Sequence, residues 1–104
     1  MDDTERRVQE GRRKAIEEII RERDHQSRRW TPEHDYGHTP EEWVCILMHY
    51  LGKAVHETGL YRGQYYAAKE FRRRLIQIAA ISAAAIEAID RHEETVKETL
   101  EAVE

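Results

Sequence analysis

The chain has 104 residues, a length that predicts one domain spanning residues 1–104. Charged residues make up 37% and hydrophobic residues 39%, so apolar side chains are scarce for a monomer, and association of chains is the expected way to complete a core. A net charge of −4 argues against general binding to nucleic acid or to membranes. The charge is uneven, because residues 6–29 are rich in arginine whereas residues 93–104 hold five glutamates and one lysine.

The few features that report on location point to the cytoplasm. Cys45 is the single cysteine, so no internal disulfide can form, and a reducing compartment is the simplest setting. No signal-peptide pattern opens the chain. The longest apolar run, residues 75–89, is interrupted by Gln77, Ser82 and Glu87, so we do not expect a membrane span.

The first predicted helix covers residues 1–30. Asp2 and Glu5 have the spacing of a helix N-cap and its reciprocal partner. The residue before a proline is pushed out of helical geometry, so this helix is expected to end before Thr31 and Pro32. A narrow apolar stripe runs along it, made up of Val8, Ala15, Ile16, Ile19 and Ile20.

A polar loop is predicted over residues 31–39, and it ends in a strong helix start. Thr39 stands at the N-cap, Pro40 at the first helical position and Glu42 at the third, which is a capping box. The second helix is predicted over residues 40–58. Its apolar positions fall within an arc of about 140° on a helical wheel, which predicts a single inward face. These positions are Trp43, Val44, Leu47, Tyr50, Leu51, Ala54 and Val55.

The third helix is predicted over residues 64–91, after a short loop at 59–64. Its apolar and small residues recur at alternating spacings of four and three, the pattern of a helix packed along another helix. These positions are Phe71, Leu75, Ile78, Ser82, Ala85 and Ile89. Residues 92–104 form an acidic tail whose apolar residues keep the same phase. That pattern fits either a continuation of the third helix or a separate fourth helix.

Two long helices joined by a short loop predict an antiparallel hairpin. Together with the N-terminal helix they make an all-α fold that has one apolar face more than a monomer can bury. Two hairpins that form a four-helix bundle would complete the core, so we predict a homodimer or a higher homo-oligomer.

Three polar residues of the loop, His34, Asp35 and His38, form the first candidate site. Imidazoles four residues apart converge on a transition metal when their segment is helical, and a further ligand would have to come from elsewhere. The glycine and the Thr-Pro pair that follow favour a turn instead. The alternative is that His34 and Asp35 hydrogen-bond the backbone of the loop.

The second and third helices add two clusters. Cys45, His49 and His56 lie on one strip of the second helix, where the first two have metal-ligand spacing and His56 lies about 10 Å further along the axis. The ordinary interpretation of this strip is a solvated face. Residues 72–74 are three arginines just before the apolar run, which predicts either another solvated face or an edge that holds an anion such as phosphate.

Three stretches carry a family resemblance: RERDHQSRRW, HDYGHTPEEWVCILMHYLGKA and FRRRLIQIAAISAAAIEAIDR. In the order of its elements, in the segment WTPEHD and in the Ile-Gln-x-Ala-Ala start of the last helix, the chain resembles the MazG-like branch of the all-α nucleoside triphosphate pyrophosphohydrolases over roughly residues 20–91. The resemblance implies a MazG-like bundle and Mg²⁺-dependent hydrolysis. Carboxylates on facing helices bind the Mg²⁺ ion in that family, and they position the triphosphate and the attacking water.

The resemblance places those acidic motifs on residues that are not acidic. It aligns the first motif with His49, Tyr50 and Lys53, and the second with Arg74 and Gln77. The standard Mg²⁺-dependent reaction is therefore not expected, and loss of the ancestral reaction is the simplest interpretation. A pocket built from these side chains would be neutral or basic. Its cations would suit phosphate, and His49 would be available for acid–base chemistry.

Three functions are compatible with these residues. The first is binding of a nucleotide or phosphate, or its hydrolysis by an altered mechanism, in a pocket that also includes Arg73 and takes His34, Asp35 and His38 from the loop. The second is a non-enzymatic helical assembly protein that contacts a protein partner through its charged faces and acidic tail. The third is a small metal site at His34 and His38. A bundle with no pocket larger than a few waters would favour the second function, and an enclosed basic cleft would favour the first.

Overall fold

The structure is a computed structural model that describes residues 1–59 and 67–103, and within these residues it is all-α, as the sequence predicts. Four helices follow one another along the chain: α1 (Asp3–Arg29), α2 (Pro32–Tyr36), α3 (Pro40–Glu57) and α4 (Ala68–Val103). None of the helices in the described part of the chain is both long and apolar enough to cross a membrane.

The α1 helix begins and ends where its local sequence predicts. The side chain of Asp2 accepts a hydrogen bond from the backbone N–H of Glu5 at 2.7 Å, so Asp2 is the N-cap. Trp30 adopts an extended conformation after the last helical residue, and its N–H still bonds to the carbonyl of Gln26 at 2.9 Å. The chain thus leaves the helix before Pro32, whose ring disfavours helical geometry in the residue that precedes it.

The short α2 helix corrects the prediction of a loop over residues 31–39. Thr31 caps it by accepting a hydrogen bond from the N–H of His34 at 3.3 Å, and Pro32 occupies the first turn. The signal for this helix is present in the sequence, because Thr31-Pro32-Glu33 repeats the Thr-Pro-Glu start of α3. The helix lasts only until Tyr36, and Gly37 follows as its C-cap.

The α3 helix confirms the predicted capping box. The backbone N–H of Thr39 donates to Oε1 of Glu42 at 3.1 Å, and the N–H of Glu42 donates to the hydroxyl of Thr39 at 3.2 Å. The hydrogen bond from the Thr39 backbone, helped by His38, lowers the pKa of Glu42. The helix ends at Glu57 with Thr58 as its C-cap, and Gly59 follows with φ 75°, a left-handed conformation that glycine adopts without strain.

The prediction of a single inward face on α3 is wrong in part, because only one side of the apolar arc is buried. Trp43 and Ala54 are buried against the rest of the molecule. Val44 and Leu51 lie on the same arc but are 53% and 48% exposed, as is the neighbouring Met48 at 64%. A single chain therefore covers only one side of this arc and leaves an apolar strip on its outer side.

The α4 helix continues through the acidic tail to Val103 without a break, so the tail is a continuation of this helix and not a separate fourth helix. Its most buried residues are Ala80, Ile81 and Ala84, and Ile81 and Ala84 join Trp43 in the core. Small side chains at these positions allow neighbouring helices to approach closely. The predicted helix start near residue 64 lies outside the described residues, and so does most of the loop predicted at 59–64.

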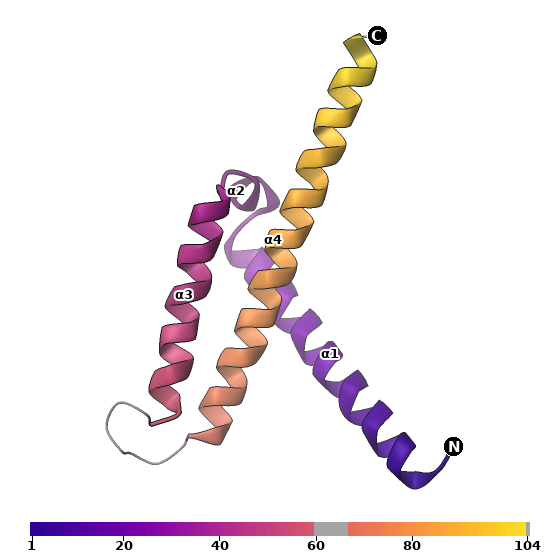
Figure 1. The fold of residues 1–104 in the computed structure, drawn as a ribbon, viewed down its shortest axis with the longest axis vertical. Helices are drawn as coiled ribbons and strands as arrows, with labels where there is room; N and C mark the ends of the chain where they lie inside the picture. Colours follow the sequence, from indigo (N-terminus) through magenta and orange to yellow (C-terminus); the bar gives the residue numbers. More distant parts are fainter. Residues whose placement is uncertain (60–66, 104) are drawn as a thin grey trace.

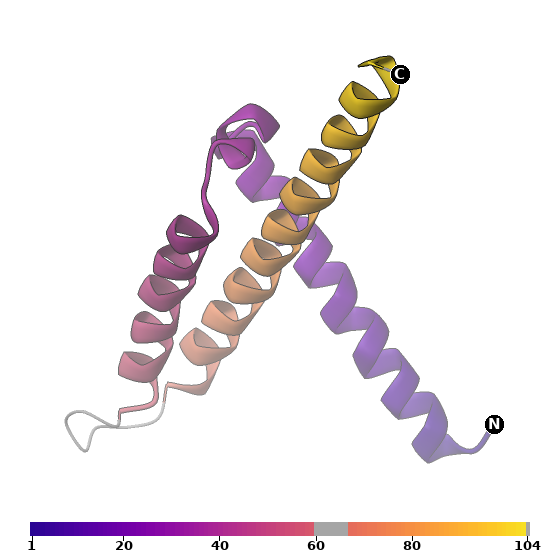
Figure 2. The same cartoon turned by 45° about the horizontal axis from the view of Figure 1, so that its top comes forward.

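The α4 helix is the axis of the fold, since all three other helices contact it. Figure 1 shows α3 running alongside the first half of α4 as the predicted hairpin, while α1 crosses α4 near its middle and diverges toward the N-terminus. Figure 2, turned by 45°, shows the same divergence of α1 from the hairpin. The molecule is flat, with extents of 59 × 43 × 20 Å. The last turns of α1, all of α2, and the first half of α3 meet beside the middle of α4.

Candidate functional site

A cleft of about 420 Å³ lies where the four helices meet. That volume falls within the range of pockets that hold small organic ligands. The residues lining it are predominantly apolar and aromatic, with a few polar groups among them. They are Arg23, Gln26, Trp30, His34, Asp35, His38, Trp43, Cys45, Ile46, His49, Tyr50, Ile81 and Ala84.

Aromatic rings form much of the wall of this cleft. The ring centroids of His34 and His38 are 4.8 Å apart, and His38 in turn lies 4.9 Å from Trp43, with both pairs edge to face. Nδ1 of His38 also lies 3.4 Å from Oε2 of Glu42, which holds the ring at the start of α3. Trp30, the C-cap of α1, also lines the cleft. The short α2 helix thus brings the two tryptophans of the chain to one site.

Gln26 is a buried polar residue at this cleft that our reading of the sequence missed. It is 6% exposed, and its Nε2 donates to Oε2 of Glu22 at 3.0 Å and to the backbone carbonyl of Gln77 at 3.4 Å. Its Oε1 accepts no hydrogen bond from the described residues. This oxygen keeps some accessible surface, and an accessible amide oxygen can accept a hydrogen bond from a ligand. The available signal was its position seven residues after Ile19, on the inner stripe of α1.

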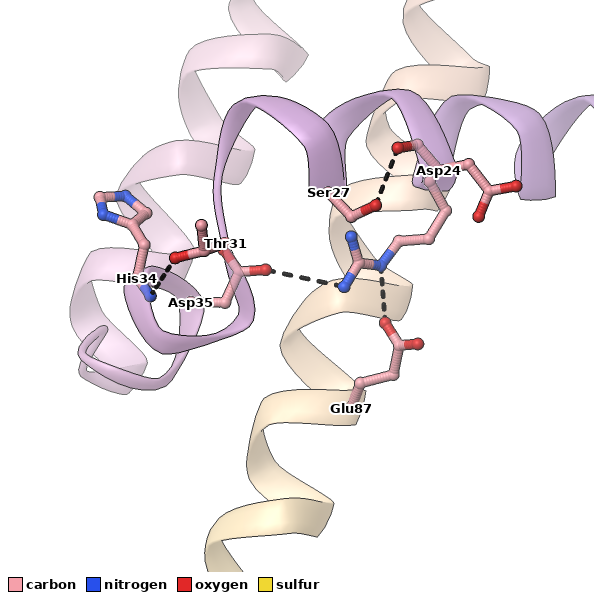
Figure 3. A network of polar contacts seen from close by, with 7 residues as sticks. Asp24, Ser27, Thr31, His34, Asp35 and Glu87 are labelled. Atoms are coloured by element: carbon pink, nitrogen blue, oxygen red, sulfur yellow. Dashed lines mark hydrogen bonds and ion pairs between the residues drawn. The ribbon is translucent and has the colours of Figure 1, made fainter.

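Arg23 fixes the position of α2 relative to α1 and α4. Its Nε lies 2.6 Å from Oε2 of Glu87 on α4, and one of its terminal nitrogens lies 3.6 Å from Oδ2 of Asp35 on α2. Figure 3 shows Asp35 and Glu87, which come from different helices, turned toward the same guanidinium group. Burial raises the pKa of Asp35 above its usual value despite the nearby arginine.

The structure places His34, Asp35 and His38 together on the lining of the cleft. The carboxylate of Asp35 is paired with Arg23, and the rings of His34 and His38 meet edge to face. Within residues 1–59 and 67–103, no three histidine, cysteine, aspartate or glutamate side chains gather closely enough to hold a metal ion. The arrangement thus gives no geometric support for the metal site that the sequence suggested for this loop.

The second candidate pocket, predicted from the family resemblance, is divided between different places in the described part of the chain. His49 and Tyr50 line the cleft, and Nζ of Lys53 lies 5.4 Å from the centre of the Tyr50 ring, one turn further along α3. Lys53 makes no ion pair with the described residues. It is therefore a cation next to the aromatic cleft that is available to a ligand.

The arginines of this set are engaged elsewhere. Arg74 donates to Oε1 of Gln77 at 3.1 Å and pairs with Oε1 of Glu57 at 3.7 Å. Arg73 lies in a separate groove between α1 and α4 and pairs with Glu70 at 3.3 Å. Both arginines are thus paired with carboxylates, although Nε of Arg74 is buried with no hydrogen-bond partner among the described residues. The backbone carbonyl of Gln77 accepts from Gln26.

Comparison with known proteins found no relative of this chain. The chain matches no protein-family model, no curated protein and no solved structure. The MazG-like resemblance therefore stays a prediction from the sequence. The residues that line the cleft are the remaining indication of function.

The cleft combines aromatic surface with a small number of polar groups. Aromatic rings can stack on planar ligands, and the amide of Gln26 on the lining offers an oxygen that accepts hydrogen bonds. Asp35 is the one carboxylate lining the described cleft, and it is paired with Arg23. A site that activates water with metal-bound carboxylates needs several such groups close together.

Proposed function

We propose that this protein binds nucleotides, with the nucleobase in the aromatic cleft and the phosphates directed toward Lys53. One observation carries the proposal: Trp30, Trp43 and Tyr50 line the same cleft as a buried glutamine whose amide oxygen has no described donor. Stacking on aromatic rings favours planar heterocycles of many kinds. The amide oxygen selects those that present an N–H group, as nucleobases do.

The position of Lys53 supports the phosphate part of the proposal. It lies on the same face of α3 as His49 and Tyr50 and beside the Tyr50 ring, so an anionic group that projects from a bound base can reach its ammonium group. His49 lies one turn before it and offers a further donor when protonated. We propose binding without the standard Mg²⁺-dependent hydrolysis, because the aligned motif positions are His49, Tyr50 and Lys53 on α3 and Arg74 and Gln77 on α4.

Intrinsic fluorescence provides a direct test, since both tryptophans of the chain line the cleft. Nucleosides, nucleotides and inorganic triphosphate are titrated separately into the purified protein. We expect nucleosides and nucleotides to change tryptophan emission, and nucleotides to bind more tightly. Absence of any emission change and of any heat of binding with all of them at millimolar concentration would overturn the proposal.

A pair of lysine variants separates the base from the phosphates. Lys53→Ala should weaken binding of a nucleoside triphosphate by about tenfold, the scale of one charge-assisted hydrogen bond, and leave nucleoside binding unchanged. Lys69→Ala is the matched control, because Lys69 lies in the groove between α1 and α4 and away from the cleft. Equal losses in the two variants would show that the effect is one of overall charge. Pyrophosphate release with Mg²⁺, with Mn²⁺ and with chelator then tests for turnover.

The outer strip of α3 supports a second candidate function, assembly of helical hairpins. Val44, Met48 and Leu51 are each about half exposed or more and lie on one side of the helix. An apolar strip of this kind on a small protein favours an interface between helices. We therefore propose a homodimer through this strip as the second candidate. Its test is the mass in solution of Leu51→Glu, which should be that of a monomer if the strip is the interface.

A further inference from the structure

Two helix ends are exposed to solvent over almost their whole length, although Arg91 at the base of the second lies over the ring of Tyr36 on α2, 5.2 Å from its centre. We call residues 3–16 of α1 the arm and residues 90–103 of α4 the tail, and both extend beyond the region where the helices pack (Figures 1 and 2). Every residue of the arm except Ala15 is exposed, and every residue of the tail is exposed. Each segment is about 21 Å long at 1.5 Å per residue. Both are exposed ends of longer helices, and packing of an apolar face against another surface would stabilise them.

The arm and the tail carry opposite charges. The arm holds five basic and three acidic residues, a net charge of +2, and the tail holds two basic and five acidic residues, a net charge of −3. Arg6 and Arg13 pair with acidic residues of their own helix, but Arg7 and Arg12 have no ion pair with any described residue. None of the five tail carboxylates forms an ion pair with the described residues either.

Each segment also presents apolar side chains to solvent. Val8 and Ile16 are about half exposed on the arm. On the tail, Val96, Leu100 and Val103 are exposed and continue one face of α4 at spacings of four and three. Spacing of this kind forms the seam of two packed helices. The two segments therefore have complementary charge and an apolar surface each.

The arm and the tail of one chain do not meet. Figures 1 and 2 agree that α1 leaves the crossing toward one end of the molecule and α4 toward the other. We propose that two copies associate end for end, so that each arm packs against the tail of its partner in a two-fold dimer. Such a contact is closed, because the same two segments of both copies are used.

Charge reversal tests this pairing. One variant carries Arg7→Glu and Arg12→Glu in the arm, and a second carries Glu93→Lys and Glu101→Lys in the tail. Each variant alone brings like charges together at both contacts, so each should dissociate at least about tenfold more readily than the original protein at low salt. An equimolar mixture restores opposite charges at both contacts, so the mixture should form a heterodimer. Sedimentation velocity measures the mass, and circular dichroism checks that each variant keeps its helix content.

The outcomes separate this interface from the other proposals. Heterodimer formation from two weakened variants supports pairing of arm and tail, because loss of folding in either variant does not produce it. The proposal is overturned if both reversed variants dimerise with the affinity of the original protein, or if their mixture dimerises no more tightly than either variant alone. It is also overturned if the original protein is monomeric at low salt. Association that ignores both reversals but is lost in Leu51→Glu assigns the dimer to the outer strip of α3 alone. The nucleotide proposal does not depend on any of these results.

Discussion

At the residue scale, the buried side chains with polar groups determine how the cleft is built. Arg23 connects three helices through Asp35 and Glu87, and Gln26 joins α1 to the backbone of α4. Arg23 and Asp35 are partly buried and Glu87 is exposed. A partly buried charge loses some of its hydration, and a nearby opposite charge offsets that loss. Burial raises the pKa of Asp35, so the loss of water outweighs the attraction of Arg23 at this carboxyl group.

The raised pKa of Asp35 predicts a pH-dependent stability. A carboxyl group whose pKa is higher in the folded state stabilises the fold when protonated, below its unfolded pKa, and that contribution is lost as the pH rises through the folded pKa. At neutral pH the ionised group is therefore a cost to folding. Asp35→Asn, which keeps the shape without the charge, should unfold at a higher temperature than the original at pH 7. The advantage should shrink as the pH falls and Asp35 becomes protonated.

Thermal unfolding followed by circular dichroism between neutral and acidic pH measures this effect. Asp24→Asn is a suitable control, since Asp24 is exposed and makes no ion pair with the described residues. The opposite result would be an Asp35→Asn variant that unfolds at a lower temperature than the original at pH 7, with a smaller difference in unfolding temperature at acidic pH. That result would show that the ion pair with Arg23 dominates instead.

The capping box of α3 predicts a second effect at single-residue scale. Thr39→Ala removes the hydroxyl that accepts from the N–H of Glu42, and loss of such a cap costs about 1 kcal/mol. Thr95→Ala is the matched control, because its hydroxyl bonds only to the carbonyl of Arg91 within α4. Urea unfolding should show a loss of stability for the first variant and little change for the second. Equal values for the two would contradict a role for the cap.

At the scale of the helices, the fold depends on small residues in α4. Ala80 is completely buried, and Ala84 is nearly so beside Trp43 and Ile81. A methyl group at such positions keeps neighbouring helices close, and a larger side chain would have to push them apart. The same close packing holds α1 and α3 at the distance that forms the cleft, because both helices contact α4.

Overpacking tests this role of α4. Ala80→Leu should lower the free energy of unfolding by about 1–3 kcal/mol, the usual cost of added volume in a packed site. Ala102→Leu adds the same volume at an exposed position of the same helix and should have little effect. Urea unfolding measures both. If Ala80→Leu is as stable as Ala102→Leu, the helices have room to adjust, and the contact at Ala80 does not set their separation.

At the scale of the whole molecule, one chain has a small core and much exposed apolar surface. The buried hydrophobic residues in the described part of the chain are Trp43, Ala54, Ala80, Ile81 and Ala84, and three of these five are alanines. Large apolar side chains remain exposed on α1, on the outer strip of α3 and on the tail of α4. Domains of this size bury a limited share of their surface, so association is an effective way to stabilise them.

The proposed association predicts that stability depends on protein concentration. The unfolding temperature should rise over a concentration range of about a hundredfold, because a dimer that dissociates on unfolding is favoured by mass action. Thermal scans at several concentrations measure this, and sedimentation at the same concentrations gives the mass. An unfolding temperature that is independent of concentration, together with a monomeric mass, would show that the single chain is stable with its apolar strips exposed.

The sequence by itself determined the features that depend on neighbours within about four residues of the chain. The helical class, the N-caps at Asp2 and Thr39, and the end of α3 at Gly59 were all predicted and confirmed. Caps and helix periods act locally, and for that reason a single sequence reveals them. The same logic would have found α2, whose Thr31-Pro32 start repeats that of α3.

The tertiary structure alone decided which of these local elements share a site. The sequence placed His49, Tyr50 and Lys53 with the arginines of α4, but α4 pairs Arg74 with Glu57 and turns Arg73 toward α1. Gln26 and Trp30 meet α3 because α1 crosses α4 at its middle, and this crossing depends on the packing of small side chains distant in sequence. Periodicity identifies the inner face of a helix, but only packing between helices selects the residues that lie opposite it.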